Sequence, residues 1–396
     1  MLDLTNDPDG HEMVPTHLWG EVFGEQSGKI AILLESALKK FAVGNDFYCP
    51  DYPGDVIPAT LDNVWQMRGT KAPAAVDFSR RVEVLDLMGI RRQLIFPSYA
   101  LFAQLLATAS EFTLSNFGVT LSEDEAHEIG RAGVQEYNDW AARTTALAPD
   151  RLRVAGYLIP NGSVADLMSD TRALVGKGIR VVNVPSSMPP AGLSPASFAL
   201  DEFYGYLADN NVALTIHVGG EYGFLKDGAW GQAEAFAPGK VESHELGLEP
   251  YSISTSYFPI ANYLTAMLLG GVFERHSQLR FGAIEIAAHW FGPLADNLDM
   301  FATKVYAERL KPFISMLPSE YMARNVRVTP FNNFEPIEQY LATYTHLQTS
   351  YMYSTDYPHV EGGKDIKRVF YERLLSLGDI VMEKFFITNA QWLLPD

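Results

Sequence analysis

From Phe78 onward, short apolar runs alternate with longer amphipathic or apolar stretches. The longer stretches predict helices over residues 78–88, 99–112, 124–147, 164–175, 194–210, 260–269, 294–308, 336–343, 366–375 and 380–388. The short, often β-branched runs predict strands over 93–96, 153–159, 179–184, 212–217, 279–286, 325–329 and 350–353. Gly89 is typical of a helix stop, and Ser122 with Glu125 has the spacing of a capping box.

This alternation of strand and helix indicates a parallel sheet with helical crossovers. A weak strand precedes Asp9, although Asn6, Asp7 and Pro8 disfavour it. The strand count then reaches about eight, the number that closes a (β/α)8 barrel. We therefore predict an α/β fold with a single TIM barrel over residues 1–396. Residues 16–77 and 221–257 follow no clean period, which is typical of lid or interface insertions over the C-terminal mouth.

Composition narrows the class of protein. The formal net charge of −18 argues against a nucleic-acid groove and against binding to an anionic membrane. The only cysteine, Cys49, excludes an internal disulfide and a cysteine-based zinc site, and a cytoplasmic location fits. We expect no signal peptide and no membrane span, because no apolar stretch is long enough. No Gly-rich dinucleotide motif supports a redox enzyme.

Metal-binding types of side chain recur where predicted strands end. Asp356 and His359 follow the strand 350–353, the Asp9/His11 pair ends the first strand, and His217 ends the strand 212–217. Taken singly, these residues have ordinary alternatives: a turn, a polar loop and a hydrogen-bonded core histidine.

Glu285 lies inside an apolar strand, where an unpaired carboxylate is costly to bury. It therefore requires a metal, an arginine or a proton. At one rim of a barrel, these strand-end residues favour a site for one divalent ion, with zinc preferred and manganese or iron possible. The predicted metal ligands are Asp9, His11, His217, Glu285 and Asp356, and the predicted catalytic residues are Glu285, His289 and Asp356. We assign His359, Arg68 and Trp290 to ligand support or substrate contact. His244 is a weaker candidate for the site.

Several stretches in this order resemble the amidohydrolase-2 group of the amidohydrolase superfamily, which includes aminocarboxymuconate semialdehyde decarboxylase and related aromatic acid decarboxylases. The resemblance runs over nearly the whole chain. Its motifs lie at residues 9–15, 86–90, 96–98, 136–140, 150–152, 216–220, 270–275, 285–290, 355–359 and 389–390.

The resemblance implies a (β/α)8 fold, one divalent metal and a homodimer. His11, His217 and Asp356 match its ligand positions. Asp9 stands where the family often has the first histidine of a His-x-His pair, and Glu285 stands where the decarboxylases have a catalytic histidine. The metal would activate water or bind oxygens of the substrate.

We therefore predict a metal-dependent hydrolase that acts on a small aromatic or unsaturated carboxylate through metal-activated water. The alternatives are a metal-dependent non-oxidative decarboxylase and a barrel that binds its ligand without turnover. Glu285 favours hydrolysis slightly, either as a ligand or as the acid/base.

Overall fold

The computed structural model describes residues 4–41, 49–221, 223–225, 228–236, 250–331 and 333–395. Its named strands form two parallel sheets, ordered β1-β2-β3 and β4-β5-β6-β7-β8. The strands are β1 (Thr5–His11), β2 (Ile90–Phe96), β3 (Leu152–Val154), β4 (Gly156–Tyr157), β5 (Val181–Asn183), β6 (Ala213–His217), β7 (Phe281–Ile284) and β8 (Val326–Val328). The prediction of an α/β fold with parallel strands is confirmed.

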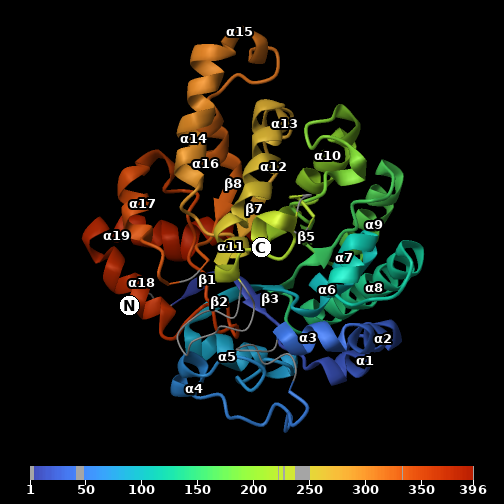
Figure 1. Ribbon diagram of the computed structural model, residues 1–396. Coiled ribbons are helices and arrows are strands. Elements are labelled where there is room, and N and C mark those ends of the chain that lie inside the picture. Colours follow the sequence, from blue (N-terminus) through green and yellow to red (C-terminus); the bar gives the residue numbers. More distant parts are fainter. Residues whose placement is uncertain are drawn as a thin grey trace.

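Helices follow most of the strands and surround them (Figure 1). The α-helices are α1 (Trp19–Val22), α2 (Glu25–Leu33), α3 (Glu35–Phe41), α4 (Leu61–Gln66), α5 (Arg81–Met88), α6 (Tyr99–Thr108), α7 (Glu111–Asn116), α8 (Glu123–Leu147), α9 (Val164–Gly176), α10 (Asp201–Asp209), α11 (Pro250–Thr255), α12 (Tyr257–Leu269), α13 (Val272–Arg275), α14 (Phe291–Met300), α15 (Ala307–Leu310), α16 (Pro318–Asn325), α17 (Ile337–Thr343), α18 (Ile366–Leu374), α19 (Asp379–Glu383) and α20 (Asn389–Leu393).

Single hydrogen bonds and isolated bridges lie near the edges of the two sheets. β3 and β4 are separated only by Ala155, whose N–H donates to the carbonyl of Ile95 at 3.0 Å. At the other edge, Tyr351 forms a parallel bridge with Val328 of β8, and Tyr357 forms one with Gly10 of β1. The chain from 351 to 357 therefore lies between β8 and β1.

β1 is a strand in spite of its sequence. All seven of its residues are buried, including the polar Asp7, Asp9 and His11. Its backbone pairs with β2 on one side, while His11 N–H donates to the Tyr357 carbonyl on the other at 2.8 Å. Long-range pairing, rather than local propensity, determines this conformation.

The longest helix, α8, packs closely on α6. It opens with the predicted capping box, because Ser122 and Glu125 each accept a hydrogen bond from the other's backbone N–H. Gly130 faces α6 so closely that a Cβ there would collide with the backbone of Ala107. Gly89 ends α5 in the left-handed conformation, as predicted (φ 64°).

Some predicted elements differ in the structure. Residues 16–77 contain α1 to α4, which were not predicted because their short apolar stretches show no sustained period. The predicted strand 350–353 makes only the bridge at Tyr351. The predicted helix 294–308 is the α-helix α14 followed by a π-helical turn, η7 (Phe301–Val305).

Substitution of Gly10, between the candidate ligands Asp9 and His11, tests how tightly β1 packs against Gln93 of β2. A Cβ at Gly10 would collide with the side-chain amide of Gln93, which is hydrogen-bonded on both sides. We expect Gly10→Ala to lower the free energy of unfolding by about 1–3 kcal/mol, the usual effect of overpacking. Urea unfolding measures this change.

The matched control is Gly176→Ala at the end of α9, where a Cβ meets no atom within 4 Å. This control should be neutral or slightly stabilising, because alanine favours a helix. Equal stability of the two variants would contradict the proposed tight contact at Gly10.

Candidate metal centre

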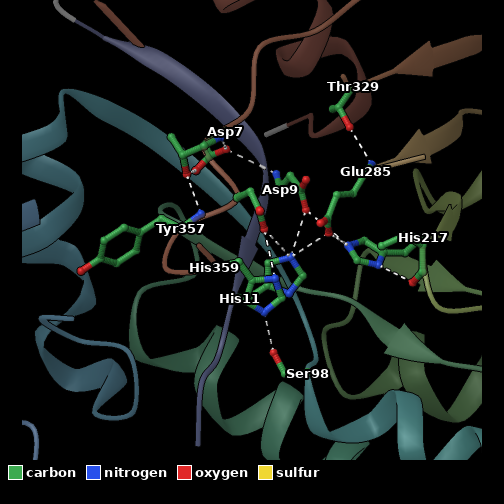
Figure 2. Close-up of polar contacts among 12 residues, drawn as sticks. Asp7, Asp9, His11, Ser98, His217, Glu285, Thr329, Tyr357 and His359 are labelled. Atoms are coloured by element: carbon green, nitrogen blue, oxygen red, sulfur yellow. Dashed lines mark hydrogen bonds and ion pairs between the residues drawn. The ribbon is translucent and has the colours of Figure 1, made fainter. Parts of the chain in front are cut away.

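The five predicted metal ligands gather around His11. Figure 2 labels four of them: Asp9, His11, His217 and Glu285. His11 Nε2 lies 3.3 Å from Asp9 Oδ1, 3.4 Å from Glu285 Oε2 and 3.2 Å from Asp356 Oδ1. His217 Nε2 lies 3.0 Å from Glu285 Oε2 and 3.4 Å from Asp9 Oδ1. The structure therefore brings together the whole set of residues that the sequence suggested as ligands.

The backbone turns sharply where two of the carboxylates leave their strands. Glu285, directly after β7, and Asp356 have positive φ angles of 55° and 52°, which residues other than glycine rarely adopt. Each turn is held by a hydrogen bond: Glu285 N–H donates to Thr329 Oγ1, and Asp356 N–H donates to the Asp9 carbonyl, both at 2.8 Å. This local strain directs both side chains to the same point.

Hydrogen bonds orient the imidazole rings. His217 Nδ1 lies 2.9 Å from the carbonyl of Val218, so Nδ1 carries a proton, and Nε2 is the ring nitrogen that faces the carboxylates. His359 stacks on His11, with ring centroids 3.7 Å apart. Its Nε2 lies 2.8 Å from Ser98 Oγ, and its Nδ1 lies 3.2 Å from Asp356 Oδ1.

The electrostatics of the site arise from burying three carboxylates together. Burial alone would lower the pKa of His217, but hydrogen bonds to Asp9 and Glu285 outweigh it and raise this pKa to about 9. In the same way, Asp356, Asp9 and Glu285 overcome burial and raise the pKa of His11. Burial would raise the pKa of Asp356, yet His359 and His11 lower it. The site thus strongly favours positive charge at its centre.

The polar atoms at this point fit a divalent metal. Apart from the imidazole–carboxylate contacts given above, several buried polar atoms have no hydrogen-bond partner in the described part of the chain. They are both oxygens of Asp9 and of Asp356, Glu285 Oε2, both nitrogens of His11 and His217 Nε2. Buried polar atoms almost always have partners. Two overlapping sets have ligand atoms within 4.8 Å of one another: Asp9, His11, His217 and Glu285, and His11, Glu285, Asp356 and His359. Mixed nitrogen and oxygen donors suit Zn²⁺, Mn²⁺ or Fe²⁺.

The remaining predicted residues lie elsewhere. His289 is exposed, and its ring contacts Tyr257. Trp290 is buried and donates from Nε1 to the carbonyls of Ile286 and Ala287. Arg68 is half-buried over the Tyr357 ring and donates to backbone carbonyls, including that of Gly363. His244 lies outside the described residues. The roles predicted for His289, Trp290 and Arg68 stay predictions.

Two acidic residues near the cluster were not singled out from the sequence. Burial raises the pKa of Glu221 to about 7, against the opposing effects of backbone N–H groups and His217. Burial likewise raises the pKa of Glu361 to about 7. Each follows a candidate ligand within five residues, in a loop that contains glycine. This position after a candidate ligand could have drawn attention to Glu221 and Glu361. The burial that raises their pKa values could not be predicted from the sequence.

A cavity of about 210 Å³ lies beside the loop that follows His217. Its walls come from the segments after β2, β5 and β6, and include Gln104, Thr108, Ser187, Gly219 and Gly220. None of the lining residues in the described part of the chain is charged. This cavity therefore suits an uncharged part of a small molecule.

Comparisons with solved structures reveal the same fold in several proteins. An amidohydrolase from Mycobacterium avium subsp. paratuberculosis K-10 has 16% sequence identity and a TM-score of 0.65, with 98% of each chain covered. 5-Carboxyvanillate decarboxylase from Novosphingobium aromaticivorans, with bound manganese and a nitrobenzoic acid, has 16% identity and a TM-score of 0.58, covering 98% of this chain and 97% of that one. 2,6-Dihydroxybenzoate decarboxylase from Rhizobium has 14% identity and a TM-score of 0.51, with the same coverage. No curated protein sequence gives a significant match.

Fold and site together define a metal-dependent enzyme with a parallel α/β architecture. The family model described as amidohydrolase matches residues 103–395, well over half of the chain. The chain therefore belongs to the amidohydrolase family, as its sequence motifs implied. Within the described ranges, no helix combines the length and apolar character needed to cross a membrane.

Metal analysis tests the cluster directly. We expect about one divalent ion per purified chain, because among the described residues the buried donor set has no partners outside the cluster. His217→Ala should lower the bound metal at least about tenfold, since it removes an oriented nitrogen. Elemental analysis after dialysis measures the content. The control is His346→Ala, an exposed histidine in η8 (Thr345–Leu347), which should keep the metal. Equal metal loss in both variants would argue against this centre.

The raised pKa of Glu221 predicts a dependence of stability on pH. Because the folded state binds this proton more tightly than the unfolded state does, Glu221 destabilises the fold as pH rises from its ordinary value of 4.5 through about 7. We expect Glu221→Gln to be about 1–3 kcal/mol more stable than the wild type at pH 8 and nearly equal to it at pH 4. Urea unfolding at the two pH values measures this. A stability difference that does not change with pH would contradict the prediction.

Proposed function

We propose that the chain closes into a (β/α)8 barrel. In this barrel β3 and β4 count as one strand, β8 is the seventh strand, and residues 351–357 take the position of the eighth. The bridges from Tyr351 to β8 and from Tyr357 to β1 support this, as does the near-continuity of β3 and β4 through Ala155. The candidate metal centre then lies at the C-terminal ends of the strands, where such barrels carry their active sites.

We propose that Asp9, His11, His217 and Asp356 hold one divalent ion, with Glu285 in the same ligand set. The oriented Nε2 of His217 supports this assignment, as do the buried carboxylate oxygens, whose contacts at the site are with imidazole nitrogens. Zinc is our expectation from the donor types, and the manganese in the 5-carboxyvanillate decarboxylase structure makes Mn²⁺ the first alternative. A bound ion would attract the oxygens of an anionic substrate and polarise them.

We propose that the reaction is the non-oxidative decarboxylation of a small aromatic or unsaturated acid. The position of Glu285 is the observation that carries this proposal. Its Oε2 lies 3.0 Å from His217 Nε2, among the ligands, and this engagement leaves it less available as a free base for water. The aromatic-acid decarboxylases with the same fold add support from analogy.

Decarboxylation needs a proton for the carbon that loses its carboxylate. The bond between that carbon and the carboxylate breaks, its electron pair stays on the carbon, and CO₂ leaves. Glu221, in the loop after β6, is the proposed source of the proton that then binds this carbon. With a pKa of about 7, a substantial fraction of Glu221 is protonated at neutral pH. The uncharged cavity beside this loop would take the ring or unsaturated chain of the substrate.

Hydrolysis through metal-activated water is the second candidate. It is favoured by the carboxylate of Glu285 at the place where the related decarboxylases have a catalytic histidine, since a carboxylate can accept a proton from water. In that case Glu285 would act as the base, and a substrate with a hydrolysable bond would occupy the cavity.

Assays of the purified holoenzyme separate the two reactions. We expect CO₂ release from at least one member of a panel of hydroxybenzoic and unsaturated acids, with deuterium in the new C–H bond when the solvent is D₂O. Glu221→Gln should lower kcat by about 10²–10⁴-fold with the metal retained, because it removes the proton donor.

The control is Glu372→Gln on α18, an exposed glutamate paired with Arg368, which should keep full activity. Turnover of esters, amides or lactones without CO₂ release would overturn decarboxylation and favour hydrolysis.

A further inference from the structure

We propose that Arg81, at the start of α5, is a positioning residue for the metal centre. It touches none of the candidate metal-binding side chains. Instead its guanidinium holds the backbone at two of the ligand-bearing segments, residues 9–11 and 355–357, in one fixed relation.

The contacts of Arg81 converge on these segments. Its Nη2 donates to the carbonyl of His11 at 3.0 Å and to the carbonyl of Tyr357 at 2.9 Å. Its Nη1 donates to the carbonyl of Ala74 at 2.9 Å. The first of these carbonyls belongs to a candidate ligand, and the second to the residue next to Asp356. Arg81 Nη2 therefore links the backbone beside Asp9 and His11 to the backbone beside Asp356.

Gln93 on β2 extends this link. Arg81 Nε donates to Gln93 Oε1 at 2.9 Å, and Gln93 Nε2 donates to Asp7 Oδ2 at 2.7 Å. Asp7 also accepts hydrogen bonds from the backbone N–H of Thr355 at 2.9 Å and from its hydroxyl at 2.6 Å. The chain Arg81–Gln93–Asp7–Thr355, here called the positioning network, thus runs beside both ligand-bearing segments.

The chemistry of Arg81 suits positioning better than filling of space. The side chain is fully buried, and no described carboxylate lies within ion-pair distance of it, so its burial is costly. Its charge is stabilised by carbonyl oxygens and by the rings of Phe78 and Tyr357, 5.0 and 4.8 Å from the guanidinium carbon. Only a planar guanidinium has donors in a fixed fork that can bond several backbones at once. An apolar residue would fill the volume without that expense.

Metal binding, which needs no substrate, tests this role. Arg81→Lys keeps the charge but loses the fork, and Arg81→Met loses both. We expect the Kd for Mn²⁺, measured by electron paramagnetic resonance titration, to rise about 10–100-fold in both variants, as for other residues that orient metal ligands. The visible absorption bands of the Co²⁺-loaded protein should also shift, because the ligand geometry changes. Gln93→Met should give a smaller change in the same direction, and it provides the test if Arg81→Met does not fold.

Arg327→Met is the matched control. Arg327 is also a buried arginine that donates to backbone carbonyls, those of Ala323 and Val326, but it has no contact with the ligand-bearing segments. This variant should lose stability in urea while its Mn²⁺ Kd stays within about twofold of the wild type, because the sites are independent. Folded Arg81→Lys and Gln93→Met proteins with wild-type Mn²⁺ affinity and an unchanged Co²⁺ spectrum would overturn the proposal. So would an equal loss of affinity in Arg327→Met. Neither result depends on which reaction the enzyme catalyses.

Discussion

Three carboxylates that share one buried space impose the constraint on which this structure depends. Asp9, Glu285 and Asp356 each have an oxygen within 3.4 Å of His11 Nε2, and these oxygens are buried away from water. Like charges cannot remain together in such a medium without positive charge among them. The left-handed turns at Glu285 and Asp356, the orientation of His217 and the pairing of β1 all maintain an arrangement that is unfavourable until a cation completes it.

The sequence alone was enough to predict those features that depend on residue types close together in the chain. His217 and Asp356 could be found because they come at or just after the end of an apolar run, and Glu285 because it is a carboxylate inside one. Asp9 and His11 could be found as a closely spaced pair of ligand-type residues. Parallel strands bring such strand ends to the same edge. The alternation of elements predicted the parallel fold for the same reason. The capping box of α8 was readable because Ser122 and Glu125 are close in sequence.

The remaining features depend on contacts between distant residues. β1 has poor strand propensity and is extended because β2 and the chain near Tyr357 pair with it. Arg81 resembles a surface residue of an amphipathic helix until its carbonyl partners are known. His289 directly follows a strand-end motif, yet its side chain points to solvent, because the backbone turns between Glu285 and Trp290. Such facts follow from tertiary structure rather than from local pattern.

The pairing of β1 with residues 356–357 has a consequence for how the protein is made. Asp9 and His11 leave the ribosome well before Asp356 and His359, because Asp356 follows His11 by 345 residues (356 − 11). Asp9 and His11 therefore lack their proposed co-ligand Asp356 while the intervening residues are synthesised. The proposed ligand set can therefore be complete only after this long intervening segment has been synthesised, and a nascent chain that stopped before Asp356 would contain most of the helices but not all of the proposed ligands.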